Sequence, residues 1–193
     1  KKSKILKKLR VQIGKYFLIS CHREENLDSD SKFKEFKNTI QQLHKFFKKK
    51  IIITTHPRTK IKFKNNFSVF HNDIMFCDPF SFTDYCQLQL NAFTVISDSG
   101  SIAEESSILG INSIHIRDAH ERPEAIEKSP IVLSSMNFED IKNRILLLQN
   151  KNIMSLKNHN KVSDYSEEYV SEKILKIIFS YTDYVNREVW KKF

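Results

Sequence analysis

The sequence predicts an α/β fold in which a parallel sheet carries helices on both faces. Short apolar runs alternate along the chain with amphipathic stretches of helical period, as they do in βαβ units. The length of 193 residues is enough to bury a sizeable core, and the 15 Phe and 6 Tyr argue against a disordered chain. We therefore expect one folded α/β domain with additional segments at its ends.

Six apolar runs are the predicted strands of this sheet. The first, KYFLISC, is typical of a buried strand, and the second is rich in β-branched residues and is stopped by His56–Pro57. The expected strands are Lys15–Cys21, Ile51–Thr55, Ile74–Cys77, Phe93–Ser97, Ser113–Ile116 and Ile131–Leu133.

The amphipathic stretches between these runs are the predicted helices. In the first of them Phe36 and Ile40 follow helical spacing, and Ser31 with Glu35 resembles an N-terminal capping signal. Gly110 is expected to end the third helix as a C-cap. The expected helices are Ser31–Lys48, Ser81–Asn91, Ser101–Leu109, Pro123–Lys128 and Phe138–Gln149.

The C-terminal part of the chain differs in pattern from the domain at residues 15–150. Residues 151–166 are polar without a period, which is typical of a linker. Residues 167–193 carry apolar side chains every three to four positions and predict one long helix, or two joined near Ser180–Thr182. This apolar stripe needs a partner surface.

The composition excludes several classes of protein. The formal net charge of +9 is carried almost entirely by scattered Lys, whereas nucleic-acid readers tend to rely on Arg, so we expect no nucleic-acid partner. No apolar run approaches the roughly 20 residues of a membrane span. The three cysteines form no CxxC pair, which indicates reduced thiols of a cytoplasmic protein, and neither a disulfide framework nor a zinc site built from cysteines.

One strand-to-helix junction has the character of a phosphate site, although neither a GxGxxG fingerprint nor a P-loop is present. A turn with small and hydroxyl-bearing side chains opens a helix here, so the backbone N–H groups of Ser99, Gly100 and Ser101 are expected to point at an anion. Glu105, one turn later, is placed to accept hydrogen bonds from ribose hydroxyls. The alternative is an ordinary capped helix.

Two further loops follow predicted strands and belong to the same edge of the sheet. Arg122 precedes a proline that suits the first turn of a helix, which favours anion binding, and a solvated ion-pair loop is the alternative. His22 is a candidate acid/base or hydrogen-bond donor, and Arg23 beside it suits phosphate. His56 faces the same edge. A single loop histidine is more often structural, so this alternative stays open for both histidines.

Four motifs together resemble a known family. HREEN at His22–Asn26, TTHP at Thr54–Pro57, SDSGSIAEES at Ser97–Ser106 and RDAHERPEA at Arg117–Ala125 occur in the order and spacing of the non-hydrolysing UDP-N-acetylglucosamine 2-epimerases. The resemblance covers about Ile5–Leu148.

The end of the chain resembles one branch of that family. DYVNREVWKK at Asp183–Lys192 is similar to the bacterial capsule-cluster branch, which handles UDP-linked deoxy amino sugars, including UDP-N-acetyl-L-fucosamine.

The resemblance implies the C-terminal half of a two-domain enzyme of glycosyltransferase-B shape. Residues 1–14 would be the connecting helix from an N-terminal half that this sequence lacks, and the full-length protein is expected to be a homodimer. The implied reaction inverts C2 of the sugar by anti elimination and re-addition of UDP, without a metal or another cofactor. The principal acid/base carboxylates belong to the other half, so the isolated chain is expected to be inactive.

The resemblance also implies roles for individual residues. Ser99, Gly100 and Ser101 would bind the diphosphate, Glu105 the ribose, and Arg122 a phosphate or the sugar. Tyr85 matches an aromatic position that packs on uracil. The residues expected at the bound UDP-sugar are thus Tyr85, Ser99, Gly100, Ser101, Glu105 and Arg122.

Three further residues are expected around this site. His22 would lie near the leaving UDP as a catalytic residue, and Arg23 and His56 would line a second, allosteric nucleotide-sugar site.

The sequence departs from the family pattern at two points. Ser101 replaces the second glycine of the DSGG motif that family members usually carry after this strand. Thr54 replaces the proline that they usually carry two residues before the histidine, and this second difference weakens the case for allosteric regulation.

The nucleotide-sugar domain of a glycosyltransferase is the alternative function, because the same two-domain shape serves both kinds of enzyme.

Overall fold

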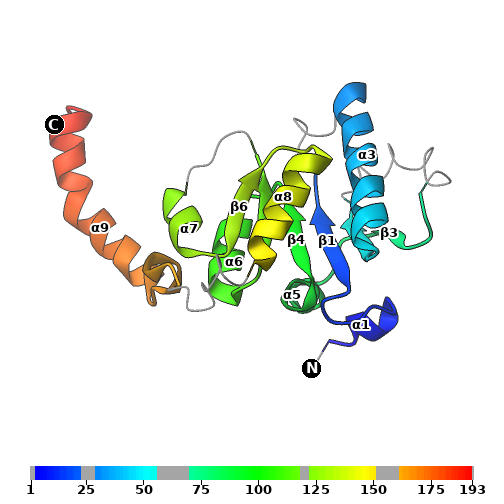
Figure 1. Cartoon of the computed structure of the whole chain (residues 1–193). Coiled ribbons are helices and arrows are strands. Elements are labelled where there is room, and N and C mark those ends of the chain that lie inside the picture. Colours follow the sequence, from blue (N-terminus) through cyan, green and yellow to red (C-terminus); the bar gives the residue numbers. More distant parts are fainter. Residues whose placement is uncertain (1–2, 23–28, 56–69, 118–121, 151–160, 193) are drawn as a thin grey trace. The chain divides into compact units, whose positions relative to one another are not determined.

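The computed structural model describes residues 3–22, 29–55, 70–117, 122–150 and 161–192 of the chain (Figure 1). Contacts divide the chain into two compact units, Lys1–Val162 and Ser163–Phe193. The boundary lies inside the linker expected at residues 151–166: Val162 is buried in the first unit, where its N–H donates to Ser107 Oγ at 2.9 Å.

The first unit is built on six parallel strands in the order β3-β2-β1-β4-β5-β6. Leu18 at the centre of the sheet pairs with Ile52 on one side and Val95 on the other. The strands are β1 Tyr16–Ser20, β2 Lys50–Thr54, β3 Ile74–Cys77, β4 Thr94–Ser97, β5 Ser113–Ile116 and β6 Ile131–Ser134. The α/β fold predicted from the alternating pattern is confirmed.

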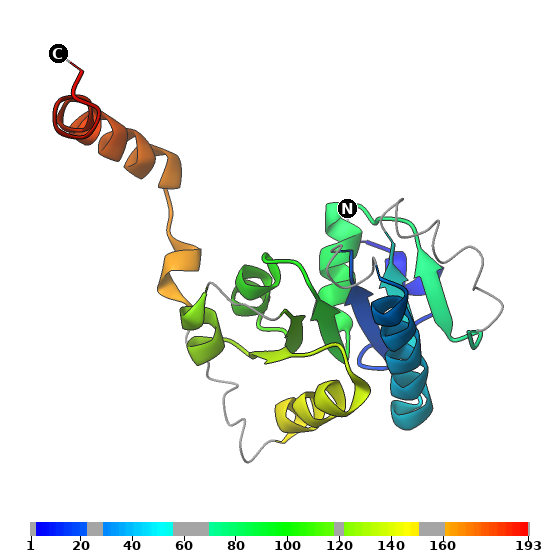
Figure 2. The same cartoon turned by 90° about the horizontal axis from the view of Figure 1, so that it is seen from above.

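Helices cover both faces of this sheet. Apolar residues of α3 and α8, among them Phe36, Ile40 and Ile145, form one buried cluster with the strands. Figure 2 shows α8 in yellow on one side of the sheet and α6 in green on the other. The helices of this unit are α1 Ile5–Lys8, α3 Asp30–Phe47, α5 Phe82–Asn91, α6 Ile102–Leu109, α7 Pro123–Lys128 and α8 Phe138–Gln149.

One predicted cap is wrong. Ser29, and not Ser31, is the N-cap of α3: its backbone is extended and its hydroxyl accepts the N–H of Lys32 at 3.2 Å. Both serines precede the apolar face, but only the residue outside the helix can turn its side chain onto free N–H groups. Gly110 ends α6 in the left-handed conformation, as predicted (φ 64°).

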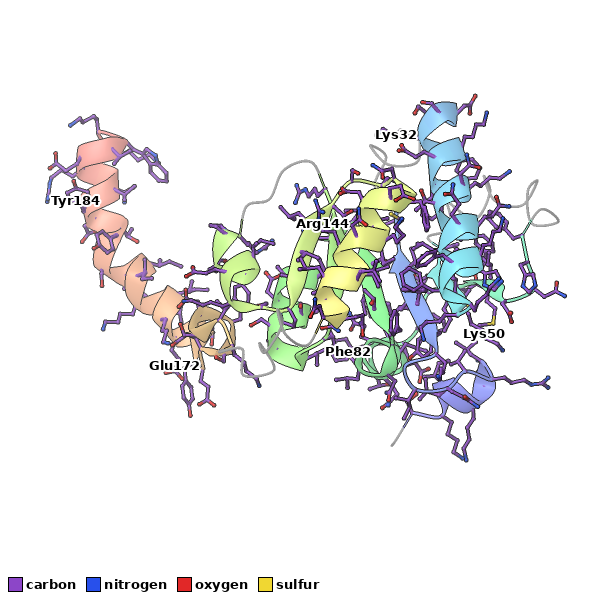
Figure 3. All side chains as sticks on the ribbon, viewed as in Figure 1. Lys32, Lys50, Phe82, Arg144, Glu172 and Tyr184 are labelled. Carbon is purple, nitrogen blue, oxygen red and sulfur yellow. The ribbon has the colours of Figure 1, made fainter. Side chains whose placement is uncertain are left out.

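The second unit is helical, and none of the large apolar side chains among its described residues, 163–192, is buried. It consists of a 3-10 helix, Ser163–Ser166, the helix α9, Val170–Tyr184, and a π-helical turn, Val185–Val189. Side chains project from α9 along its whole length, between the labelled Glu172 and Tyr184 in Figure 3. Among the described helices, none has both the length and the apolar character needed to cross a membrane.

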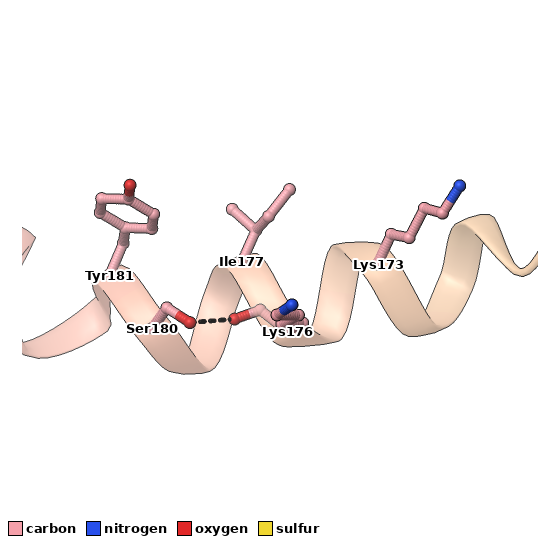
Figure 4. Close-up of a pocket in the computed structure, with 5 residues that line it drawn as sticks. All are labelled: Lys173, Lys176, Ile177, Ser180 and Tyr181. Carbon is pink, nitrogen blue, oxygen red and sulfur yellow. Dashed lines mark hydrogen bonds between the residues drawn. The ribbon is translucent and has the colours of Figure 1, made fainter. Parts of the chain in front are cut away.

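Of the two alternatives for this segment, the continuous helix is correct. α9 runs through residues 180–182 without a break, and Ser180 and Thr182 donate their hydroxyls to the carbonyls of Lys176 and Ile178, both at 2.6 Å. A shallow pocket along α9 is lined by five described residues of this helix (Figure 4): Lys173, Lys176, Ile177, Ser180 and Tyr181.

Two helix ends provide a matched pair for a stability test. Gly110 and Lys48 each come directly after a helix, and the backbone of both residues is in the left-handed conformation. A Cβ added at Gly110 would meet no atom within 4 Å. Gly110→Ala should therefore lower the free energy of unfolding by about 1 kcal/mol through backbone strain alone. Lys48→Gly should raise it by about 0.5 kcal/mol, because it removes the same strain. Urea unfolding followed by circular dichroism checks both, and changes of equal sign would contradict the argument.

Candidate functional site

The candidate site lies at the carboxyl ends of β1 and β4, where the strand order reverses. Chain segments leave these neighbouring strands in opposite directions, which opens a crevice in parallel sheets of this order. His22 follows β1, and Ser99 and Gly100 follow β4. The sheet therefore places two of the loops predicted from sequence next to each other.

Asp98 ties these two loops together. Its side chain is fully buried, and Oδ2 accepts the backbone N–H of His22 at 2.9 Å, while Oδ1 lies 3.3 Å from Nδ1 of the same histidine. The N–H of Asp98 donates to the carbonyl of Ser20 at 3.1 Å. The imidazole of His22 is 44% exposed, so Asp98 holds a ring that faces solvent. Asp98 is not among the site residues that the sequence motifs predict.

Cys21 is buried beside this carboxylate. Burial, and after it the charge and the hydrogen bond of Asp98, hold the pKa of the Cys21 thiol well above its usual value. A thiol in this environment is a poor nucleophile. Cys21 therefore acts as a packed core residue, and all three cysteines, Cys21, Cys77 and Cys86, are free.

The turn before α6 leaves two backbone amides available. The N–H of Ser99 donates to Ser97 Oγ at 3.1 Å, so one of the three predicted donors is already used. Within the described part of the chain, the N–H groups of Gly100 and Ser101 donate to no protein acceptor. Unpaired amides at the positive end of a helix suit an anion such as phosphate.

Arg122 reaches this helix start from the loop before α7. Its Nη1 lies 3.4 Å from the carbonyl oxygen of Gly100, and its Nε pairs with Glu104 Oε1 at 3.0 Å. A Cβ on Gly100 would lie 3.3 Å from Nη1, which is tighter than ordinary packing. The absence of a side chain at Gly100 thus lets the guanidinium approach the turn. Sequence reasoning missed Glu104, which fixes the direction of Arg122.

Glu105 is held by hydrogen bonds on both carboxylate oxygens. Ser101 Oγ donates to Oε1 at 2.7 Å, and Gln89 Nε2 donates to Oε2. Ser99 Oγ lies 3.0 Å from Ser101 Oγ. The hydroxyl of Ser101, which replaces a glycine of the family motif, thus links Ser99 to Glu105. Each carboxylate oxygen has a second lone pair, which leaves Glu105 able to accept from a ligand.

Tyr85 of α5 completes the cluster. It is half-buried, and burial, followed by the charge of Glu105, raises the pKa of its phenol to about 12, although a hydrogen bond with the Ser20 side chain acts in the opposite direction. The phenol is therefore neutral over the physiological range. The two other expected site residues, Arg23 and His56, lie outside the described residues.

Comparison with known proteins identifies the family of this chain. The family described as UDP-N-acetylglucosamine 2-epimerase matches residues 1–179. The chain belongs to the UDP-N-acetylglucosamine 2-epimerase family. A UDP-N-acetylglucosamine 2-epimerase of Methanocaldococcus jannaschii is 33% identical over 141 residues, which are 70% of this chain and 38% of the relative.

Solved structures of the family agree with this assignment. UDP-N-acetylglucosamine 2-epimerase from Rickettsia bellii is 41% identical with a TM-score of 0.77, over 99% of this chain and 51% of that one. The Methanocaldococcus jannaschii enzyme in complex with UDP-GlcNAc and UDP is 28% identical with a TM-score of 0.78, over 93% of this chain and 49% of that one. The chain spans about half the length of these relatives or less.

Asp98 should contribute to folding as well as to the site. Asp98→Ala removes a buried acceptor of the His22 N–H, and it should lower the free energy of unfolding by about 2 kcal/mol. Asp78→Ala, an exposed carboxylate after β3, is the matched control and should change it by less than about 0.5 kcal/mol. Urea unfolding of the unaltered chain and the two variants measures the difference. Equal stability of the two variants would contradict a stabilising role of Asp98.

Proposed function

We propose that this chain supplies the UDP-binding half of a UDP-N-acetyl-hexosamine 2-epimerase. The observation that carries the proposal is the start of α6, where the N–H groups of Gly100 and Ser101 have no acceptor among the described residues and Arg122 Nη1 lies 3.4 Å from the carbonyl oxygen of Gly100. Together they offer backbone and charged donors to one diphosphate. A solved family relative is described in complex with UDP-GlcNAc and UDP.

The remaining residues fit the other parts of the nucleotide. Glu105 would accept hydrogen bonds from the ribose hydroxyls, sharing its oxygens with Ser101 and Gln89. Tyr85 would pack on the uracil. His22, whose orientation Asp98 fixes, would act at the phosphate of the leaving UDP.

The proposed reaction inverts the configuration at C2 of the sugar. A base removes the C2 proton and UDP leaves C1, giving a glycal to which UDP adds again after a proton returns to the opposite face of C2. Departure of UDP builds negative charge on its phosphate, and preorganised donors lower the energy of that charge. Gly100, Ser101 and Arg122 would supply those donors, while the acid/base carboxylates would belong to the N-terminal half of the longer protein.

Several finer features belong to the same proposal. The substrate would be UDP-GlcNAc or UDP-ManNAc, or the UDP-linked precursor of N-acetyl-L-fucosamine, in the synthesis of bacterial capsule or cell-envelope polysaccharide. The free cysteines agree with the reducing cytoplasm, and the full-length protein would be a homodimer of glycosyltransferase-B shape. Arg23 and His56 would regulate it from a second site. The family match favours the epimerase over a glycosyltransferase domain.

Binding of UDP tests the phosphate site. Arg122→Ala should weaken UDP binding about tenfold or more, because it removes a charged hydrogen-bond donor. Arg144→Ala is the matched control: Arg144 lies on α8 (Figure 3), pairs with Asp140 Oδ1 at 3.1 Å and should leave UDP binding unchanged. Isothermal titration with UDP and with uridine, which lacks the diphosphate, measures both effects. Equal loss of uridine and UDP binding in Arg122→Ala would contradict a phosphate contact.

Turnover tests the assignment of the two halves. The 193-residue chain should bind UDP without converting a UDP-N-acetyl-hexosamine, whereas the longer protein should exchange the C2 proton with deuterated water in the absence of any acceptor. Proton nuclear magnetic resonance of the sugar follows this exchange. Epimerisation by the 193-residue chain alone would contradict the proposed division, and transfer only to an added acceptor would favour a glycosyltransferase.

A further inference from the structure

Three metal-ligating side chains gather at the edge of the sheet opposite to the candidate site. His44 lies in the last turn of α3, and His71 and Asp73 precede β3, so all three belong to the amino-terminal ends of β2 and β3. One ligand atom from each side chain lies within 4.8 Å of the other two. We propose that His44, His71 and Asp73 bind one divalent transition-metal ion, with Zn²⁺ as the expected occupant.

His44 is already oriented as a metal ligand would be. Its Nδ1 lies 2.9 Å from the carbonyl oxygen of Lys49, and since a carbonyl only accepts, Nδ1 carries the hydrogen. The lone pair is then on Nε2. Metal-bound histidines commonly donate their second N–H to a backbone carbonyl, which fixes the ring. The Lys49 side chain, bonded to the carbonyl of Gly14 at 3.0 Å, in turn anchors this turn.

His71 and Asp73 have the spacing of two ligands of one ion. Nδ1 of His71 lies 3.5 Å from Oδ2 of Asp73. Tetrahedral Zn²⁺ with bonds of about 2.0–2.1 Å requires ligand atoms about 3.3 Å apart. The carbonyl of Asp73 accepts the N–H of Ile51 at 2.9 Å, so the sheet holds the backbone that carries this ligand.

Binding requires one local rearrangement. The rings of His44 and His71 are stacked with centroids 4.5 Å apart and planes inclined by 30°, so their in-plane lone pairs do not converge. The His71 side chain is 60% exposed and can rotate out of the stack. Nδ1 of His71 now accepts the backbone N–H of Asp73 at 3.1 Å. On metal binding, Nδ1 would bind the ion in place of this N–H, and the N–H would donate to water.

The donor set determines which ion is expected. Two imidazoles and one carboxylate suit Zn²⁺ and its neighbours Co²⁺ and Ni²⁺, whereas Mg²⁺ and Ca²⁺ prefer an all-oxygen shell. A water molecule would complete the tetrahedron. Such an ion would hold the end of α3 to the turn before β3, and it would stabilise the fold by an amount that rises with the logarithm of the free ion concentration above its dissociation constant. It would be a structural ion, apart from the chemistry at the opposite edge.

Titration of the full chain with Co²⁺ and Zn²⁺ tests the site. The unaltered chain should bind one equivalent, with the visible absorption of tetrahedral Co²⁺ and a raised melting temperature. His71→Ala and Asp73→Asn should each weaken binding at least tenfold. Both residues lie outside the buried core, so circular dichroism of the metal-free variants should match that of the unaltered chain. Asp78→Asn, an exposed carboxylate at the other end of β3, should bind as the unaltered chain does.

Three results would overturn the proposal. The first is the absence of saturable binding by the unaltered chain. The second is equal affinity of His71→Ala and Asp73→Asn with the control. The third is a thiolate-to-cobalt charge-transfer band in the near ultraviolet, which would assign the ion to a cysteine and not to the two histidines and Asp73.

Discussion

The site depends on one buried carboxylate. The side chain of Asp98 has no exposed surface. Its carboxylate accepts a hydrogen bond from the backbone N–H of His22, and its own backbone N–H donates to the carbonyl oxygen of Ser20. Two segments far apart in the sequence are thereby fixed to each other at the point where the sheet order reverses. Burial of a carboxylate costs free energy that hydrogen-bond donors offset, so the position of Asp98 depends on the His22 backbone and on the strand ends that bring the two residues together.

A second set of contacts prepares the start of α6 for an anion. Glu104 and Glu105 are adjacent in sequence but have different roles. Glu104 pairs with Arg122 and orients it, whereas Glu105 accepts hydrogen bonds from the Ser101 hydroxyl and the Gln89 side-chain amide. Arg122 and Glu105 are thus each positioned by a residue of another element. This arrangement reduces the reorganisation that ligand binding would otherwise require.

Much of the fold could be predicted from the sequence, because apolar periodicity reports directly on burial. The bounds of β3, β5, α7 and α8 agree with the expected ranges, and Gly110 ends α6 as its type suggests. The cap at Ser29 could not be predicted, because capping depends on the backbone conformation, which the residue type alone does not reveal. The role of Asp98 was not predicted, because it rests on a contact with His22, a residue far away in the sequence. An acidic residue directly after an apolar strand is nevertheless a signal that could have indicated a site residue.

The contact between Gly100 and Arg122 also restricts how this protein can change over time. A methyl group at position 100 would lie 3.3 Å from the guanidinium, so a larger residue there requires the Arg122 side chain to move by a few tenths of an ångström. The two positions, 22 residues apart, should therefore vary as a pair among homologous sequences. Loss of the glycine would therefore shift the cation at this turn even where the arginine itself is kept.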